Sequence, residues 1–499
     1  MHVGSPTSPA KRTLLIVILV AIAVCLLLLG IWSARRPLDA LILLLALLVF
    51  HSGLSRVLEN VFVLDNRLVL LLSAWKEAVI AGLAVAAFVR LRRGSVRARL
   101  SPAVLAALFL ALAVIRIGLD VAAHVGPTDE LFAARNACEF AVLFIVVAVL
   151  APDVAWLRRA SWVLVPLVVV AAEAALIELL YGSRLYDVLY HAPGQQLASS
   201  FTVRFGGQIL PRAAGTYTAP NEFGLGLAVY LFAVILPLAL LRPGPFSRAL
   251  LGLAAMTSSV ALALTYSRSA WVGAAVGAGL LIVLLHRRII GWVRGHARRR
   301  IGTGWRRTAV LAAAVVVLIV VFVASSGSQF LMATLTGNEV SAAARPSSLA
   351  AGVEALLHSP LGQGMTAAGP KALSVNKTAV LTENWYLVYG IQLGWLALAC
   401  LCAFLGACLI SLMRRVHAAF SSPEELTARA AFQIGALGAL TAALVGALFI
   451  PSLLDLPASV TLWTFVAATL GPDAAVSADT APLDPIGRAP RSNQKGTAR

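Results

Sequence analysis

The chain has 499 residues, of which 60% are hydrophobic and only 12% are charged. Soluble domains are about 45–50% apolar and about 25% charged. A globular core of this size cannot hide the excess, so the composition excludes a soluble protein and indicates that lipid is the solvent. The net charge of +18 fits basic cytoplasmic loops, and no interleaving of aromatic and basic residues indicates a nucleic-acid surface.

Apolar runs long enough to cross a bilayer recur along the chain, and each should be helical because lipid offers the backbone no hydrogen-bond partner. They lie at residues 13–32, 38–54, 68–89, 102–119, 136–151, 161–180, 222–241, 249–265, 270–285, 308–325, 384–411 and 430–450, with a weaker run at 456–471. The first run follows Lys11 and Arg12 but precedes no small-residue cleavage site, so we expect a retained span. The pattern predicts an all-α polytopic membrane protein with 12 or 13 transmembrane helices.

Four basic clusters predict which loops are cytoplasmic. They lie at residues 287–307, 90–99, 158–159 and 414–415. If all four are inside, the outer segments are 120–135, 181–221 and 326–383. The N-terminus is then outside, which conflicts with the preference of Lys11 and Arg12 for the inside.

The spans and loops divide the chain into four parts. These are N-terminal transmembrane helices (1–325), a large extracytoplasmic loop (326–383), C-terminal transmembrane helices (384–471) and a disordered cytoplasmic tail (472–499). Segment 181–221 is amphipathic and should lie at the membrane interface. The large loop should contain a helix from Arg345 to His358, with Pro346 near its start, and we interpret the loop as a structured lid.

Ionisable residues within spans mark candidate sites, because each costs roughly 2.5–3.5 kcal/mol to insert. They are Lys76, Glu77, Arg116, Arg135, Glu139, Glu173, Glu178 and Arg268. Simpler explanations exist for several of them: Lys76 and Glu77 neutralise neighbouring helices, Arg116 snorkels to the interface, and Glu173 and Glu178 are solvated at the outer end of their span.

Four outer-face elements are harder to explain by packing alone. They are Arg212–Asn221, whose Pro220 starts a helix; the turn Thr265–Arg268; Arg345 with the following Ser359–Gly364; and Thr382–Leu387, where the loop re-enters the bilayer. Three arginines and Glu383 are thereby placed on one side of the membrane. Arginine suits pyrophosphate oxygens, and a carboxylate suits a general base. No acidic metal motif accompanies them, so we expect neither a metal nor another cofactor.

These elements resemble those of the O-antigen ligase and O-antigen polymerase superfamily, over roughly residues 65–450. The resemblance implies a bacterial inner-membrane glycosyltransferase of the GT-C class that acts on undecaprenyl-pyrophosphate-linked glycans. It assigns the pyrophosphate to Arg212, Arg268 and Arg345, which would also stabilise the charge on the leaving group, and it counts Arg268 as catalytic. It further marks, as substrate-binding residues, Arg135, Lys76, Tyr217, Asn221, Asn384 and Tyr386.

The sequence departs from the ligases at one position. Glu383 stands where the ligases have a catalytic histidine, and a carboxylate there resembles the polymerase and exopolysaccharide branches. Glu383 is therefore the candidate base, and His358 is a less favoured substitute that more simply caps its helix. We favour polymerisation of lipid-linked repeats, with a flippase or chain-length regulator as possible partners. The alternatives are ligase-type transfer to a lipid or protein acceptor, and a transporter or flippase without transferase activity.

Overall fold

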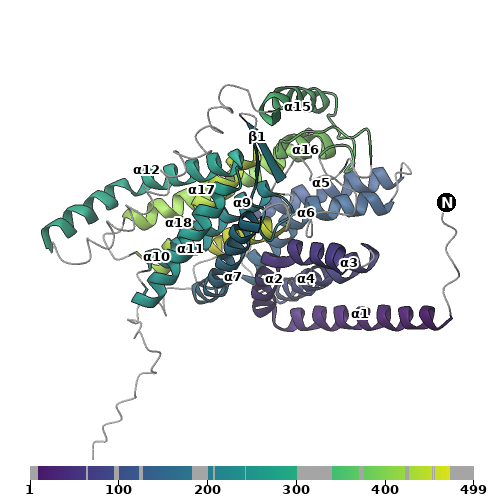
Figure 1. The fold of residues 1–499 in the computed structure, drawn as a ribbon, viewed down its shortest axis with the longest axis horizontal. Helices are drawn as coiled ribbons and strands as arrows, with labels where there is room; N and C mark the ends of the chain where they lie inside the picture. The colour runs from purple at the N-terminus through teal and green to yellow at the C-terminus, as the bar shows by residue number, and fades with distance from the viewer. Residues whose placement is uncertain are drawn as a thin grey trace, which may run out of the picture.

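The computed structural model is a bundle of helices with one short pair of strands (Figure 1). It describes residues 9–62, 66–94, 101–122, 127–181, 201–205, 208–241, 243–299, 340–369, 372, 376–421, 426–451, 453 and 456–471. The predicted span 308–325, the first part of the large loop and the tail 472–499 lie outside the described residues. The predicted all-α polytopic fold is confirmed.

The elements follow one another in this order. They are α1 (Pro9–Arg35), α2 (Pro37–Arg56), the π-helical turn η1 (Val57–Val61), α3 (Asn66–Ser73), α4 (Trp75–Arg92), α5 (Ser101–Ala122), α6 (Pro127–Leu150), α7 (Val154–Tyr181), β1 (Thr202–Phe205), β2 (Gln208–Pro211), α9 (Pro220–Tyr230), η3 (Leu231–Ile235), α10 (Leu236–Leu240), α11 (Pro245–Leu264), α12 (Arg268–Arg299), α15 (Val340–Leu357), α16 (Trp385–Leu393), α17 (Trp395–Ser421), α18 (Ala428–Ala447) and α19 (Leu456–Leu470).

Within the described ranges, eight helices are long and apolar enough to cross a membrane. Four shorter apolar helices coincide with the predicted spans at 13–32, 136–151, 270–285 and 456–471. The prediction of one continuous span at 384–411 is wrong. Gly394 adopts φ +89°, a conformation that ends the short α16 before α17 begins.

Two further details differ from the sequence-based expectations. The loop helix does not start at Arg345: α15 covers Val340–Leu357 and includes Pro346 in its interior. Part of segment 181–221 forms the antiparallel pair β1–β2, in which Thr202 pairs with Pro211. This pair was not expected, because its strands are only four residues each.

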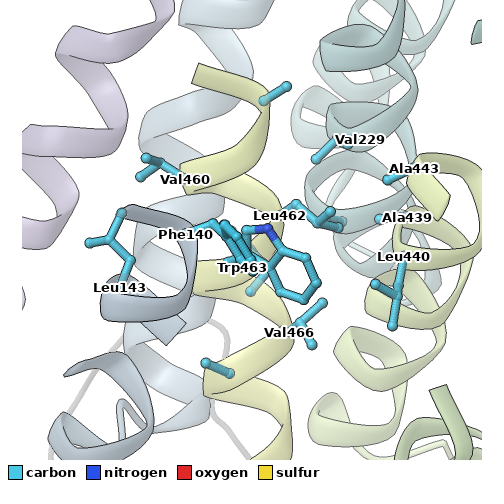
Figure 2. Close-up of a cluster of buried hydrophobic side chains, with 14 of the residues drawn as sticks. Phe140, Leu143, Val229, Ala439, Leu440, Ala443, Val460, Leu462, Trp463 and Val466 are labelled. Carbon is cyan, nitrogen blue, oxygen red and sulfur yellow. The ribbon is translucent and has the colours of Figure 1, made fainter. Parts of the chain in front are cut away.

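The weakest predicted span, α19, occupies the centre of the bundle (Figure 2). Its Trp463 is fully buried, with its ring centroid 5.5 Å from that of Phe140 and 5.2 Å from that of Phe404. α19 packs against α6, α9 and α18. A helix without a polar or charged face belongs inside a core rather than on its surface. α19 is of this kind, because it has no charged residue and its few hydroxyl groups are scattered and buried.

Small residues allow α12 and α18 to approach closely. A Cβ built on Gly273 would lie 2.3 Å from the carbonyl oxygen of Ala442, and one built on Gly277 would lie 2.7 Å from that of Gly438. These distances leave no room for a side chain, so both glycines are required for the contact. Close backbone approach through small residues is a usual way for helices to associate in lipid, and here it fixes the start of α12 against the end of α18.

Basic helix ends gather on one face of the bundle. Arg90 at the end of α4 donates to Leu150 O at the end of α6 (2.5 Å), and Arg159 near the start of α7 pairs with Asp39 near the start of α2 (3.1 Å). Arg415 donates to the last two carbonyls of α19, those of Thr469 and Leu470. The opposite ends of these helices therefore share the other face, which carries the candidate site.

Candidate active site

Arg212 joins the first two sequence elements of the predicted site. Its Nε donates to Thr265 O (2.9 Å), and its Nη2 donates to Asn221 Oδ1 (2.5 Å) and to Tyr266 O (3.5 Å). The acceptors are available because α11 ends at Leu264 and the chain turns through Tyr266, which has φ +48°. Asn221 thus binds the Arg212 side chain rather than its own backbone, and Pro220 begins α9 as expected.

Arg268 is the first residue of α12 and directly follows that turn. Its side chain is partly exposed, whereas Thr265 and Ser267 beside it are fully buried. Helix N-termini favour anions because their first N–H groups and the helix dipole point outward. The turn therefore places a guanidinium and a helix N-terminus at the same position.

Arg345 and Glu383 form an ion pair, with 3.3 Å between Nε and Oε2. The pair exists because α15 packs on the exit of the large loop: Ser348 donates to Leu381 O (2.9 Å), and a Cβ on Gly352 would lie 2.9 Å from the Thr382 hydroxyl oxygen. α15 therefore holds Glu383, the candidate base, through these contacts.

Both halves of the site meet at the end of α18. A Cβ on Gly446 would lie 3.4 Å from Ser269 O, one residue after Arg268. Asn384, one residue after Glu383, donates through Nδ2 to Leu448 O (2.9 Å) and caps α16 by accepting from Leu387 N. The two elements that carry Arg268 and Glu383 thus flank the same helix end, although they lie far apart in the sequence.

A second polar cluster lies within the bundle. Lys76 is 4% exposed, and its Nζ lies 3.2 Å from His51 Nε2 and 3.4 Å from Glu77 Oε1. Arg135 Nη1 lies 2.8 Å from the same Glu77 oxygen. The sequence marked Lys76 and Arg135, and the structure joins them through Glu77. It did not mark His51, which sits in an apolar run without any motif.

Two residues have structural surroundings that the sequence did not reveal. Glu178 is not solvated as expected: it is 2% exposed, and its Oε2 accepts from the N–H groups of Ala214 (3.0 Å) and Gly215 (2.8 Å). Arg56 donates to Thr218 O (2.5 Å). Glu178 and Arg56 thus fix the segment that follows Arg212, a role that requires the tertiary contact between α7, α2 and this segment.

The two predicted tyrosines take part in helix packing. Tyr217 is buried, with its hydroxyl 3.3 Å from that of Tyr230, and Tyr386 donates to Leu444 O (3.0 Å). These contacts tie the segment after Arg212 to α9, and α16 to α18.

Two other residues from the sequence analysis lie at helix ends. His358 is exposed at the end of α15, with its Nδ1 2.8 Å from Glu354 O, which agrees with the interpretation as a helix-end residue. Arg116 does not simply snorkel, because its Nη2 pairs with Asp120 at 2.5 Å.

Within the part of the chain that the structure describes, no three His, Cys, Asp or Glu side chains gather closely enough to hold a metal ion. The site described above contains guanidinium groups and the Glu383 carboxylate, together with asparagine amides, hydroxyl groups and backbone atoms. Such a set can bind an anion and accept a proton.

A family model described as O-antigen ligase matches residues 253–402. The matched segment contains Arg268, Arg345, Glu383, Asn384 and Tyr386, and it does not include Lys76, Arg135, Arg212, Tyr217 and Asn221. No curated protein matches the chain. The predicted resemblance to the O-antigen ligase and polymerase superfamily is confirmed, and it identifies a multi-pass membrane enzyme of the glycosyltransferase type, either polymerase or ligase.

Proposed function

Because residues 253–402 match the O-antigen ligase family, we propose that the protein polymerises oligosaccharide repeats carried on undecaprenyl pyrophosphate. The reaction takes place at the outer face of the bacterial inner membrane. The opposite, basic face of the bundle is then cytoplasmic, as positively charged helix ends favour. The observation that carries the proposal is the convergence of the Arg268 turn and the Arg345–Glu383 pair at the end of α18.

The arginines bind the pyrophosphate of the donor. Arg268 contributes both its side chain and the N-terminus of α12, which favour an anion together. The Arg212 side chain donates to the carbonyl oxygens of Thr265 and Tyr266. It therefore also positions Arg268, which follows this turn. Lys76 and Arg135 supply further positive charge within the bundle and bind the same lipid-linked substrate.

Glu383 is the base of the transfer step. It removes the proton from a hydroxyl of the acceptor sugar, whose oxygen forms a bond to the anomeric carbon of the donor. The bond between that carbon and the pyrophosphate oxygen breaks, and undecaprenyl pyrophosphate leaves with the electron pair. The arginines stabilise the charge that develops on the leaving oxygen.

The Arg345–Glu383 pair links donor binding to this step. In the free protein each partner neutralises the other at 3.3 Å. A pyrophosphate that binds Arg345 competes for its guanidinium and leaves Glu383 free to accept a proton. Donor binding therefore prepares the base, which favours reaction only when the donor is present.

Ligase-type transfer of finished glycan to a lipid or protein acceptor is the second candidate. The description of the matching family, O-antigen ligase, favours it. The glutamate at position 383 favours the polymerase, because the resemblance places a histidine at this position in ligases. Both reactions use the same donor and the same leaving group, so they differ only in the acceptor.

Substitution of Glu383 and Arg268 tests the proposal. We expect Glu383→Ala and Arg268→Ala to abolish polymer and to leave single lipid-linked repeats, as measured by gel electrophoresis of extracted lipid-linked glycans. Glu354→Ala, on the exposed side of α15, and Arg248→Ala, exposed near the start of α11, are the matched controls and should make normal polymer. Full-length polymer from either site variant would contradict the role of that residue.

A deletion strain separates the two candidate reactions. A cell that lacks the protein should accumulate single lipid-linked repeats if the protein is a polymerase. Accumulation of long lipid-linked polymer would instead show a ligase. A flippase or a chain-length regulator is the partner that we propose for the polymerase.

A further inference from the structure

The lid helix α15 (Val340–Leu357) has three sides of different character. One side faces the loop exit through Arg345, Ser348 and Gly352. The other two sides are exposed, and they differ in chemistry. We call them the apolar flank and the polar flank, and the difference between them indicates what covers each.

The apolar flank consists of Leu349, Val353 and Leu357, which are 50%, 41% and 61% exposed. Residues four apart lie on one side of a helix, so the three side chains form a continuous stripe. The polar flank consists of Ser347, Glu354 and His358, which are also exposed. An exposed helix in water has no reason to separate leucine and valine from its polar residues in this way.

Two hydrogen bonds join α15 and the residues that follow it to two membrane spans. Leu361, 80% exposed, follows the helix, and its carbonyl oxygen accepts from Arg116 Nη1 within the α5 span at 3.4 Å. Trp395 at the start of the α17 span donates through Nε1 to Leu356 O of the lid helix (2.8 Å). The last turn of α15 is therefore bonded to the α17 span, and the segment after it to the α5 span.

Around these ties, the span ends themselves expose apolar side chains. Ile115 and Leu119 of α5 are 59% and 58% exposed, and Leu396 of α17 is 65% exposed. Tryptophan with its ring in apolar surroundings and its N–H on a polar group is typical of the membrane–water interface. Trp395 meets this description, because it is half exposed among apolar neighbours and donates to a backbone carbonyl.

We propose that α15 is an interfacial helix, whose apolar flank is inserted into the lipid leaflet on the site face of the bundle. Amphipathic helices of this kind lie about 5–10 Å into the boundary between headgroups and acyl chains. The polar flank then faces water, and the third side holds Arg345 against Glu383. This inference does not depend on the reaction proposed above, because it rests on exposure and on contacts with the spans.

Spin labels on the two flanks test the proposal in vesicles of phosphatidylethanolamine and phosphatidylglycerol. The labels are placed by Val353→Cys and Leu357→Cys on the apolar flank, and by Glu354→Cys and His358→Cys on the polar flank. The background is the full chain with its five native cysteines replaced by alanine. We expect the labels on the apolar flank to collide several-fold more with oxygen than with a water-soluble nickel chelate, and the labels on the polar flank to show the reverse.

Two outcomes would overturn the proposal. Equal access of the nickel chelate to both flanks would show that the apolar flank is in water. Shielding of positions 353 and 357 from both oxygen and the chelate would show that a second copy or another protein covers it.

A second measurement avoids the alanine background. A membrane-impermeant maleimide should label Glu354→Cys several-fold faster than Val353→Cys in otherwise unchanged chains, with the unsubstituted chain as blank. Positions 353 and 354 are consecutive in α15. They therefore lie at nearly the same point along the helix axis and differ mainly in the side of the helix that they face. Equal rates would also overturn the proposal.

Discussion

Gly362 lies where the segment after α15 packs against the break between α16 and α17, and its replacement by alanine should weaken that contact. Gly362 has φ +81°, and a Cβ there would lie 2.5 Å from Gln392 O and 2.8 Å from Gly394 N. These are backbone atoms, so they cannot move aside as the end of a side chain could. The 360–364 segment and the 391–395 segment must therefore separate.

The magnitude follows from the contacts that this separation strains. The left-handed conformation costs alanine about 1–2 kcal/mol. Three backbone hydrogen bonds join the segments: Gln363 N to Ile391 O (2.8 Å), Gly364 N to Gln392 O (3.1 Å) and Trp395 N to Pro360 O (3.0 Å). Each contributes about 1 kcal/mol net, so Gly362→Ala should cost about 2–5 kcal/mol.

The assay is the melting temperature of the purified protein in nanodiscs, followed by tryptophan fluorescence, together with polymer production in cells. Gly406→Ala in α17 is the matched control, because no atom lies within 4 Å of a Cβ built there. Alanine is the better residue in a helix interior by about 0.5–1 kcal/mol, so the control should melt at or above the temperature of the unsubstituted protein. Equal melting temperatures for the two variants would refute the reasoning.

Three further predictions concern the segments that hold the site. Glu178→Ala should lower stability and polymer production, because two buried N–H groups lose their acceptor at about 1–3 kcal/mol each, whereas Glu173→Ala should change neither. Gly273→Ala should lower the melting temperature, because overpacking against α18 costs about 1–3 kcal/mol. Gly279→Ala in the same helix should not lower it, because no atom lies within 4 Å of a Cβ built there. Arg345→Gln and Glu383→Gln should each reduce polymer strongly. The melting temperature should change little, because partly exposed ion pairs contribute about 0–1 kcal/mol. A large fall in melting temperature would indicate that the ion pair is structural instead.

The outline of the fold could be predicted from the sequence. The apolar runs determine which segments become helices, because any backbone in lipid must satisfy its own hydrogen bonds. The motifs also selected Arg268 and Glu383, which the structure brings to the same end of α18. The pairing of Arg345 with Glu383 and of Arg135 with Glu77 could not be read from the sequence, since neither pair lies within one helical turn.

The sequence by itself determined the helical membrane fold, the basic face and the segments that carry the candidate chemistry, because those properties depend on local composition and order. Only the tertiary structure decided the rest. It placed the short α19 at the centre of the bundle, broke the span at Gly394, and turned Glu178 from an expected solvated residue into the acceptor for two backbone N–H groups. It also tied α15 and the segment after it to two membrane spans. Each of these features depends on which segments, distant in the sequence, pack against one another. The hydropathy of the chain does not determine that packing.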